Sequence, residues 1–391
     1  MNAGSRIYLD HNATTPLRPA ARDAMVVALG GPANASSVHG EGRAARGLVE
    51  SARRSLAAAT GAKVKNIVFT SGATEANVTV LTPNISVSGQ LRPATRLFVG
   101  ATEHASVLSA GRFDPRRVTI LPVTGDGVID KSQAERLVRG EAEAGGVPLV
   151  SVMAANNETG VVQPLAGISR IVRDAGGYLH VDAVQALGRI PVSIGAWDCD
   201  IMSVSSHKIG GPQGVGAIVY GRDDLRAAPL ITGGGQEGRH RAGTENVAAI
   251  AGFGAALEEL AVAEEAARIT ALRDWLEAEL RHIYGDTVVF GRDVPRLPNT
   301  ISFAVAGMVA ETALIACDLA GAAVSSGSAC SSGKVSSSHV LEAMGVPVDL
   351  ARGALRLSLG WTSTREDVER FAEIWRGLVN RMKPAKAGKA A

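Results

Sequence analysis

Short apolar runs alternate with stretches of helical pattern between residues 60 and 220 of this chain. The runs span residues 66–70, 96–100, 148–153, 178–181, 200–204 and 216–220. Strands that alternate with helices favour a mostly parallel sheet whose faces are covered by helices. The sequence therefore predicts an α/β fold.

The length of the chain indicates a second domain. A chain of 391 residues is long for one hydrophobic core. Residues 246–283 show a helical pattern rich in alanine, glutamate and leucine, and we place the domain boundary inside it, near residue 262. We expect residues 15–262 to form a large domain, and residues 1–14 together with 263–391 to form a smaller α+β domain.

The composition argues against nucleic acid and membranes as partners. Aromatic residues make up 4% of the chain and the net charge is +2, so the sequence offers neither a basic stripe nor a stacking platform. No apolar stretch approaches the length of a membrane span, and the N-terminus does not resemble an export signal. Three cysteines, an odd number in a large chain, favour a reducing compartment, and we expect the cytoplasm.

Polar residues follow several of the apolar runs, at the position where an open parallel sheet binds its ligands. Residues 71–76 are small or polar and open a helix whose N-terminus would suit a phosphate, although an ordinary helix cap is the alternative. His104 and Asn157 follow two other runs, and each could instead be structural, as a hydrogen-bonding histidine and as part of a turn. Five such strand ends in one sheet together predict a ligand site.

Residues 180–211 give the most specific indication of a cofactor. Asp182 follows one apolar run, and Lys208 follows the next in the setting Ser-Ser-His-Lys-Ile-Gly-Gly. A lysine amine can condense with the aldehyde of pyridoxal 5'-phosphate (PLP), while a carboxylate keeps the pyridine nitrogen protonated and small polar residues face the phosphate. Gln185, three residues after Asp182, could face the same ring. The alternative is a surface lysine in a loop after a buried strand.

The three cysteines lie in different surroundings. Cys199 and Cys317 fit small core positions. Cys330 lies in a serine- and glycine-rich segment, residues 325–334, that holds no large apolar residue to bury it. An accessible thiol favours a nucleophile. The alternatives are a metal ligand, for which no second cysteine lies nearby in the sequence, and an incidental surface thiol.

Two further segments carry positive charge where an anion could bind. The glycine-rich residues 233–238 lead into residues 239–246, which hold two arginines and a threonine, and they form either a loop that closes on an anion or a plain connector. Arg356 interrupts an apolar, strand-like run, so it needs a partner. That partner would be a substrate carboxylate or an internal salt bridge.

Taken together, these motifs resemble the cysteine desulfurases of the NifS/IscS type, within the class V aminotransferase group of fold-type I PLP enzymes. The resemblance covers nearly the whole chain and is strongest at residues 70–77 (Thr-Ser-Gly-Ala-Thr-Glu-Ala-Asn), 156–160 (Asn-Asn-Glu-Thr-Gly), 205–208 (Ser-Ser-His-Lys) and 325–330 (Ser-Ser-Gly-Ser-Ala-Cys). It implies a PLP-dependent transferase fold of type I, with a mostly parallel seven-stranded sheet in the large domain. It also implies a mobile cysteine loop in the small domain, at about residues 325–337.

The resemblance further implies roles for individual residues. Lys208 would form the Schiff base with the cofactor, Cys330 would be the nucleophile that becomes a persulfide, and His104 would stack on the pyridine ring and shuttle protons. Asn157 and Arg356 would hold the substrate carboxylate. The residues implied to bind the cofactor are Ala73, Thr74, His104, Asp182, Gln185, Ser205, His207, Lys208 and, from the other subunit of a homodimer, Thr244.

The implied activity is the PLP-dependent removal of sulfur from L-cysteine, which gives L-alanine and a persulfide on Cys330. The sulfur would pass to an acceptor protein, such as an iron–sulfur scaffold, for the assembly of iron–sulfur clusters. It could also be used to make another thio-cofactor or to thiolate tRNA. No metal site is expected, although Cys330 could transiently ligate an iron–sulfur cluster. The alternatives are selenocysteine lyase, another PLP-dependent β-lyase or a transaminase on the same fold, and a non-enzymatic PLP-binding scaffold protein.

Overall fold

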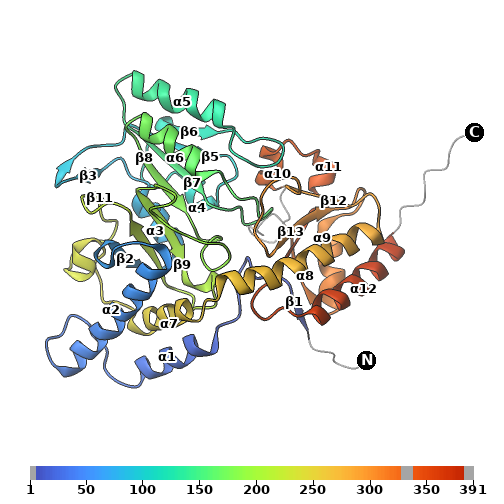
Figure 1. Cartoon of the computed structure of the whole chain (residues 1–391), viewed down its shortest axis with the longest axis horizontal. Coiled ribbons are helices and arrows are strands. Elements are labelled where there is room, and N and C mark those ends of the chain that lie inside the picture. Colours follow the sequence, from blue (N-terminus) through green and yellow to red (C-terminus); the bar gives the residue numbers. More distant parts are fainter. Residues whose placement is uncertain (1–5, 327–337, 383–391) are drawn as a thin grey trace, which may run out of the picture.

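The structure, a computed structural model, describes residues 6–326 and 338–382. A larger and a smaller body lie side by side along the longest axis of the molecule (Figure 1). The larger body is built from the first two thirds of the chain. The smaller body combines the C-terminal third with strand β1 (Ile7–Tyr8), which lies close to the last helix.

The larger body contains a seven-stranded sheet. Its strands are, in spatial order, β2 (Ile67–Thr70), β10 (Gly216–Tyr220), β9 (Ile201–Ser205), β8 (Tyr178–Asp182), β7 (Pro148–Met153), β5 (Arg96–Gly100) and β6 (Val118–Leu121). Strand β10 runs antiparallel to both of its neighbours, while the other neighbouring pairs are parallel. The predicted α/β fold with a mostly parallel seven-stranded sheet is therefore confirmed.

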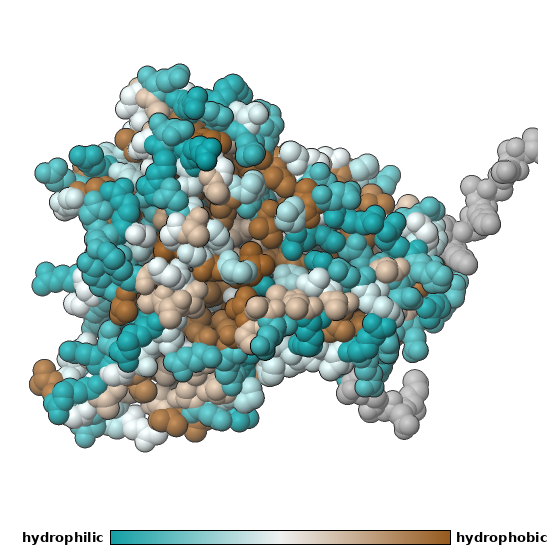
Figure 2. Space-filling view, in the orientation of Figure 1, coloured by the Kyte–Doolittle hydropathy of each residue, from teal (hydrophilic) through white to brown (hydrophobic). Residues whose placement is uncertain are grey.

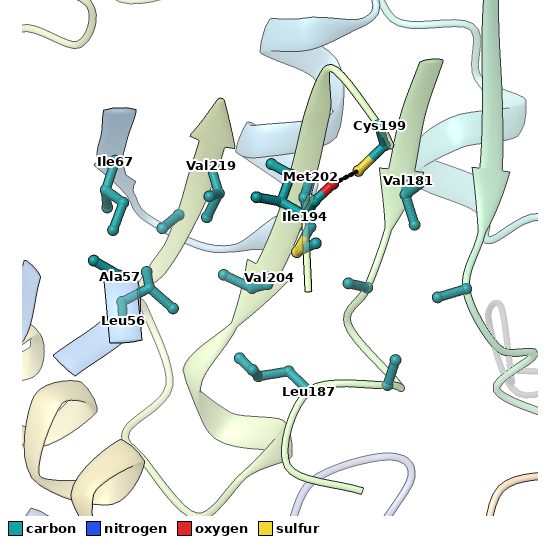
Figure 3. Close-up of a cluster of buried hydrophobic side chains, with 14 of the residues drawn as sticks. Leu56, Ala57, Ile67, Val181, Leu187, Ile194, Cys199, Met202, Val204 and Val219 are labelled. Carbon is teal, nitrogen blue, oxygen red and sulfur yellow. Dashed lines mark hydrogen bonds between the residues drawn. The ribbon is translucent and has the colours of Figure 1, made fainter. Parts of the chain in front are cut away.

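One face of this sheet packs against the larger set of helices. Because successive residues of a strand point to opposite faces, alternate apolar residues reach this side. Val181, Met202, Val204 and Val219 of the sheet share an apolar cluster with Leu56 (Figure 3). The helices that contribute to this cluster are α1 (Pro19–Leu29), α2 (Gly40–Thr60), α5 (Lys131–Glu143), α6 (Leu165–Asp174) and α7 (Val247–Glu258).

The opposite face is covered by α3 (Ala73–Val80) and α4 (Ala105–Leu108), whose apolar residues join a second cluster with the sheet. A three-stranded antiparallel sheet of β11 (Leu225–Ala227), β3 (Ile85–Val87) and β4 (Gln90–Leu91) packs against the same cluster. Helix α3 follows the end of β2, and α4 follows the end of β5. The N-termini of both helices therefore lie at the edge of the sheet where these strands end.

The smaller body is an α+β arrangement. Its four-stranded antiparallel sheet has the order β12 (Val288–Val289), β13 (Thr300–Ala304), β16 (Leu355–Ser358) and β15 (Ser325–Ser326). Strand β1 pairs in parallel with β14 (Ala322–Ala323). The accompanying helices are α8 (Val262–Ile283), α9 (Ala310–Leu319), α10 (His339–Ala343), α11 (Val348–Ala351) and α12 (Arg365–Met382). The core includes Phe303 packed edge-on to Trp375, with ring centroids 5.1 Å apart.

The helical pattern at residues 246–283 forms two helices rather than one. Helix α7 ends at Glu258 and α8 begins at Val262. The division of the chain into residues 15–262 and residues 1–14 with 263–391 stays a prediction. Among the helices of the described residues, none is both long and apolar enough to cross a membrane.

Candidate active site

A cavity of about 850 Å³ lies between the carboxyl ends of the central strands and the smaller body. Polar side chains cover most of the face shown in Figure 2, and apolar side chains gather along its middle, between the two bodies. The predicted site residues that line the cavity are Ala73, Thr74, His104, Asn157, Asp182, Gln185, Ser205, His207, Lys208 and Arg356. The fold thus brings together residues that are far apart in the sequence.

Lys208 ends a single 3-10 turn that directly follows strand β9. Its Nζ donates to the backbone oxygens of Asn12, at 2.6 Å, and of Ala13, at 2.7 Å. Burial, followed by the charges of two nearby arginines, lowers the pKa of the Lys208 amine to about 7. A large fraction of this amine is therefore neutral near pH 7, which is the form that attacks an aldehyde.

Asp182 is the last residue of strand β8, and it is buried and lines the cavity. Its Oδ1 accepts the backbone N–H of Val184 at 3.0 Å, and its Oδ2 accepts Nδ2 of Asn77 at 2.9 Å. The nearby Gln185 donates from Nε2 to the backbone oxygen of Asn12 at 3.1 Å. The carboxylate is thus fixed in orientation by two donors, and it can accept a further N–H from a bound ring.

His104 caps the N-terminus of helix α4 with its own side chain. Its Nδ1 accepts the backbone N–H of Ser106 at 3.2 Å and lies 2.8 Å from the Ser106 hydroxyl, which in turn accepts Nδ2 of Asn77 at 2.9 Å. Because Nδ1 is the acceptor, the proton of the neutral ring sits on Nε2. Burial, the largest cause, lowers the pKa of His104, so the ring is neutral near pH 7.

The first turn of helix α3 forms one wall of the cavity. Ser71, Gly72, Ala73 and Thr74 line this wall, and the first N–H groups of a helix have no partner within it. These N–H groups and the positive end of the helix dipole suit an anion. Gly216 of β10 packs against this turn so closely that a Cβ there would lie 2.7 Å from the Gly72 carbonyl carbon.

Arg356 of strand β16 reaches the cavity from the smaller body. Its Nη2 donates to Oδ1 of Asp10 at 2.7 Å, and its Nη1 donates to the backbone oxygen of Asn157 at 2.9 Å. The internal salt bridge that the sequence left open is therefore present. Its Nε is buried and has no hydrogen-bond partner among the described residues, so the guanidinium retains a donor for a further anion.

Two predicted site residues are not among the described residues that line the cavity. Thr244 is exposed and does not line the cavity of its own chain. Cys330 lies outside the described residues. Ser326 and Ser338, the described residues on either side of the range 327–337, both line the cavity.

The other two cysteines are buried. The Cys199 Sγ packs in the core against the backbone oxygen of Ile194, at 3.9 Å (Figure 3), and burial raises the pKa of its thiol. Burial also raises the pKa of the Cys317 thiol to about 11. Neither cysteine lines the cavity, so neither offers a reactive thiolate there.

Sequence reasoning missed several polar residues that support the site. Asn77, the last residue of the motif at residues 70–77, donates hydrogen bonds from its Nδ2 to both Asp182 and Ser106. Burial raises the pKa of Glu158 to about 7, and its Oε2 accepts from the Ser338 hydroxyl at 2.5 Å. Both residues lie in motifs that the sequence shows, at residues 70–77 and 156–160, but the motifs do not reveal these contacts because the partners are distant in the sequence. Among the described residues no cluster of three or more metal-ligating side chains was found.

The family model described as aminotransferase class-V matches residues 7–371. The chain belongs to the aminotransferase class-V family. One relative, the cysteine desulfurase IscS of Dictyoglomus turgidum, is 39% identical to this chain over 388 residues. The match covers 96% of this chain and 95% of that protein.

Solved structures of family members have the same fold. The NifS-like protein from Rickettsia africae superposes with a TM-score of 0.86 at 35% identity, covering 96% of this chain and 99% of that one. A structure described as SspA in complex with cysteine superposes with a TM-score of 0.74 at 28% identity, covering 90% of this chain and 98% of that one. The aminotransferase class-V fold predicted from the sequence is confirmed.

Proposed function

We propose that this chain is a cysteine desulfurase, which uses PLP to remove sulfur from L-cysteine and yields L-alanine and a persulfide on Cys330. The observation that carries the proposal is the Lys208 amine, which is held by two backbone oxygens and shares one cavity with Asp182 and Arg356. Relatives named cysteine desulfurase, 39% and 40% identical over nearly the whole chain, support it.

The polar groups of the cavity match the polar parts of PLP. The Lys208 amine suits the aldehyde, and the Asp182 carboxylate suits the protonated ring nitrogen. The N–H groups of the first α3 turn, with Ser205 and His207 beside them, suit the phosphate. Gln185 would meet the ring hydroxyl. When bound, PLP supplies an electron sink for the carbanion that forms at the substrate α-carbon.

The chain's own residues would bind the substrate and move its protons. Arg356 would hold the carboxylate of L-cysteine with its unpartnered Nε, beside Asn157. Lys208, about half of which is neutral near pH 7, would take up the α-proton as a base. His104, which lines the cavity, would stack on the cofactor ring.

Cys330 would supply the sulfur-accepting thiolate. It would attack the substrate sulfur, so that the new S–S bond forms as the Cβ–S bond of the substrate breaks. The electron pair of the broken bond stays on the carbon skeleton, which takes up a proton and leaves as alanine. The buried Cys199 and Cys317 cannot replace this thiolate.

We further propose a cytoplasmic homodimer in which Thr244 of each subunit reaches the phosphate site of the other. Thr244 is exposed and does not line the cavity of its own chain, which supports this arrangement. A sulfur-acceptor protein, such as an iron–sulfur scaffold, would take the persulfide sulfur from Cys330.

Replacement of Cys330 tests the proposal. Cys330→Ala should bind PLP with unchanged visible absorbance but form alanine from L-cysteine at least roughly 100-fold more slowly, because the nucleophile is lost. Mass spectrometry of the intact protein should show the added sulfur in wild type and not in the variant. Cys317→Ala, which removes a buried thiol, is the matched control and should keep both alanine formation and the added sulfur. Wild-type alanine formation by Cys330→Ala would contradict the proposal.

A further inference from the structure

Arg189 is a buried arginine close to the reactive amine. Its Nη1 donates to the backbone oxygen of Gln185 at 2.9 Å and to the side-chain Oε1 of the same residue, and its Nη2 donates to the backbone oxygen of His11 at 3.2 Å. Arg189 is 9% exposed, and across residues 6–326 and 338–382 it forms no ion pair with a carboxylate. A buried cation is normally paired, so an unpaired one acts strongly on nearby charges.

Arg189 and Lys208 are held by the same short segment. The backbone oxygen of His11 accepts from Arg189, and those of Asn12 and Ala13, the next two residues, accept from the Lys208 Nζ. Both side chains also line a second, smaller cavity of about 40 Å³ beside this segment. Arg189 and Lys208 are therefore held next to each other by the backbone oxygens of three consecutive residues.

The other charges that face Lys208 either offset each other or favour its charged form. Arg356 would disfavour the ammonium form, but it is paired with Asp10 at 2.7 Å, and Asp10 favours that form. Asp182 also favours the ammonium form, whereas the neighbouring His207 is neutral near pH 7 because burial lowers its pKa to about 4. His104 is neutral for the same reason.

Arg189 itself stays charged under these conditions. Burial lowers its pKa only to about 9, so the guanidinium remains a cation near pH 7. After burial, its charge is the largest cause of the lowered pKa of Lys208. A cation beside a lysine disfavours a second positive charge, which is a known way to make a lysine nucleophilic.

We propose that Arg189 is a positioning residue whose fixed positive charge keeps the neighbouring Lys208 amine neutral and whose guanidinium orients Gln185 toward the cofactor ring. The proposal deepens the proposed function, because it rests on Lys208 as the amine that reacts with PLP. Its test needs neither cofactor nor turnover, since the titration of Lys208 can be followed in the protein without PLP.

The test is a titration of Lys208 in the full-length protein freed of PLP. Trace labelling with acetic anhydride, which acylates only the neutral amine, is followed over a pH series by mass spectrometry of the Lys208 peptide. The exposed Lys63 in the same sample serves as an internal reference. Wild type should reach half-maximal labelling near pH 7. Arg189→Met should raise that midpoint by about one pH unit, because the repelling charge is gone.

A matched control separates charge from packing. Arg18 is a second buried arginine in the smaller cavity, but both oxygens of Glu265 accept from it, so its charge is offset. The double variant Arg18→Met with Glu265→Gln removes this pair without changing the net charge, and it should leave the Lys208 midpoint unchanged.

An unchanged midpoint in Arg189→Met, or an equal rise in the double variant, would overturn the proposal. Arg189→Gln, which keeps a hydrogen-bonding side chain, repeats the test if Arg189→Met does not fold. If the midpoints behave as expected but wild type forms no alanine from L-cysteine, the proposed function fails and the inference about Arg189 stands.

Discussion

At the scale of single residues, burial and hydrogen bonding decide which chemical form each group around the cavity takes. The Lys208 amine is half neutral because burial lowers its pKa to about 7. Burial also lowers the pKa of His104 and raises that of the neighbouring Glu103 well above its usual range. Near pH 7 the site therefore holds an amine that is about half neutral and a neutral imidazole, and the charged form of the buried Glu103 carboxyl next to His104 is disfavoured. In water, each of these groups would carry more charge.

The hydrogen bond between the Ser106 hydroxyl and Nδ1 of His104 gives a prediction at this scale. Ser106→Ala should raise the pKa of His104 and slow alanine formation, because the hydroxyl that supports the neutral ring at 2.8 Å is lost. A hydrogen bond worth about 1 kcal/mol corresponds to about 0.7 pKa unit and to a roughly fivefold change in rate. NMR of the protein labelled with 15N-histidine, followed over a pH series, gives the His104 pKa.

Ser109→Ala is the matched control for this change. The Ser109 hydroxyl bonds to the backbone oxygen of Ser106 at 3.2 Å and does not touch the His104 ring. This variant should keep the wild-type His104 pKa and the wild-type rate. A Ser106→Ala protein whose His104 titrates as in wild type would show that the hydroxyl does not support the ring.

At the scale of secondary structure, the ends of strands and the starts of helices create the cavity. Helix α3 begins three residues after strand β2 ends, which directs its first N–H groups at the cavity. Strand β10 runs antiparallel beside β2, and its Gly216 lies against the same turn. The position of the proposed phosphate site therefore depends on the fit between a strand and a helix rather than on any charged side chain.

Gly216→Ala tests this fit. A Cβ at this position would lie 2.7 Å from the Gly72 carbonyl carbon and 2.9 Å from the Ala73 nitrogen, so the helix start must move. We expect PLP to bind about tenfold more weakly, as measured by absorbance titration of the protein freed of cofactor. Gly47→Ala, at a glycine of α2 with open space around it, should bind PLP as wild type does. Equal affinity in both variants would refute the role of this contact.

At the scale of the whole molecule, the N-terminal segment joins the two bodies at the Lys208 amine. The Asn12 side chain donates to the Asn157 backbone oxygen at 3.0 Å and to the Thr300 hydroxyl of the smaller sheet at 2.9 Å. The Asn12 backbone oxygen accepts from Lys208. The amine is therefore held by a segment that is bonded to both bodies.

The sequence predicted the parts of this architecture that local patterns encode. All six apolar runs became strands of the central sheet. Strand β6 (Val118–Leu121) was missed because it lies at the sheet edge, where only Leu121 is buried. The bond between Asn77 and Asp182 and the unpaired charge of Arg189 arise only when distant segments meet, so no local pattern could reveal them. The roles of Cys330 and Thr244 stay predictions.

The central claim is that Lys208 is the amine that binds PLP covalently, and borohydride trapping tests it most directly. Full-length protein is saturated with PLP, reduced with borohydride, digested, and analysed by mass spectrometry to find the lysine that carries the reduced cofactor. We predict the modification on the peptide that contains Lys208, and its loss in Lys208→Ala but not in Lys63→Ala, whose lysine is exposed. Trapping on another lysine, or no trapped cofactor in wild type, would contradict the account.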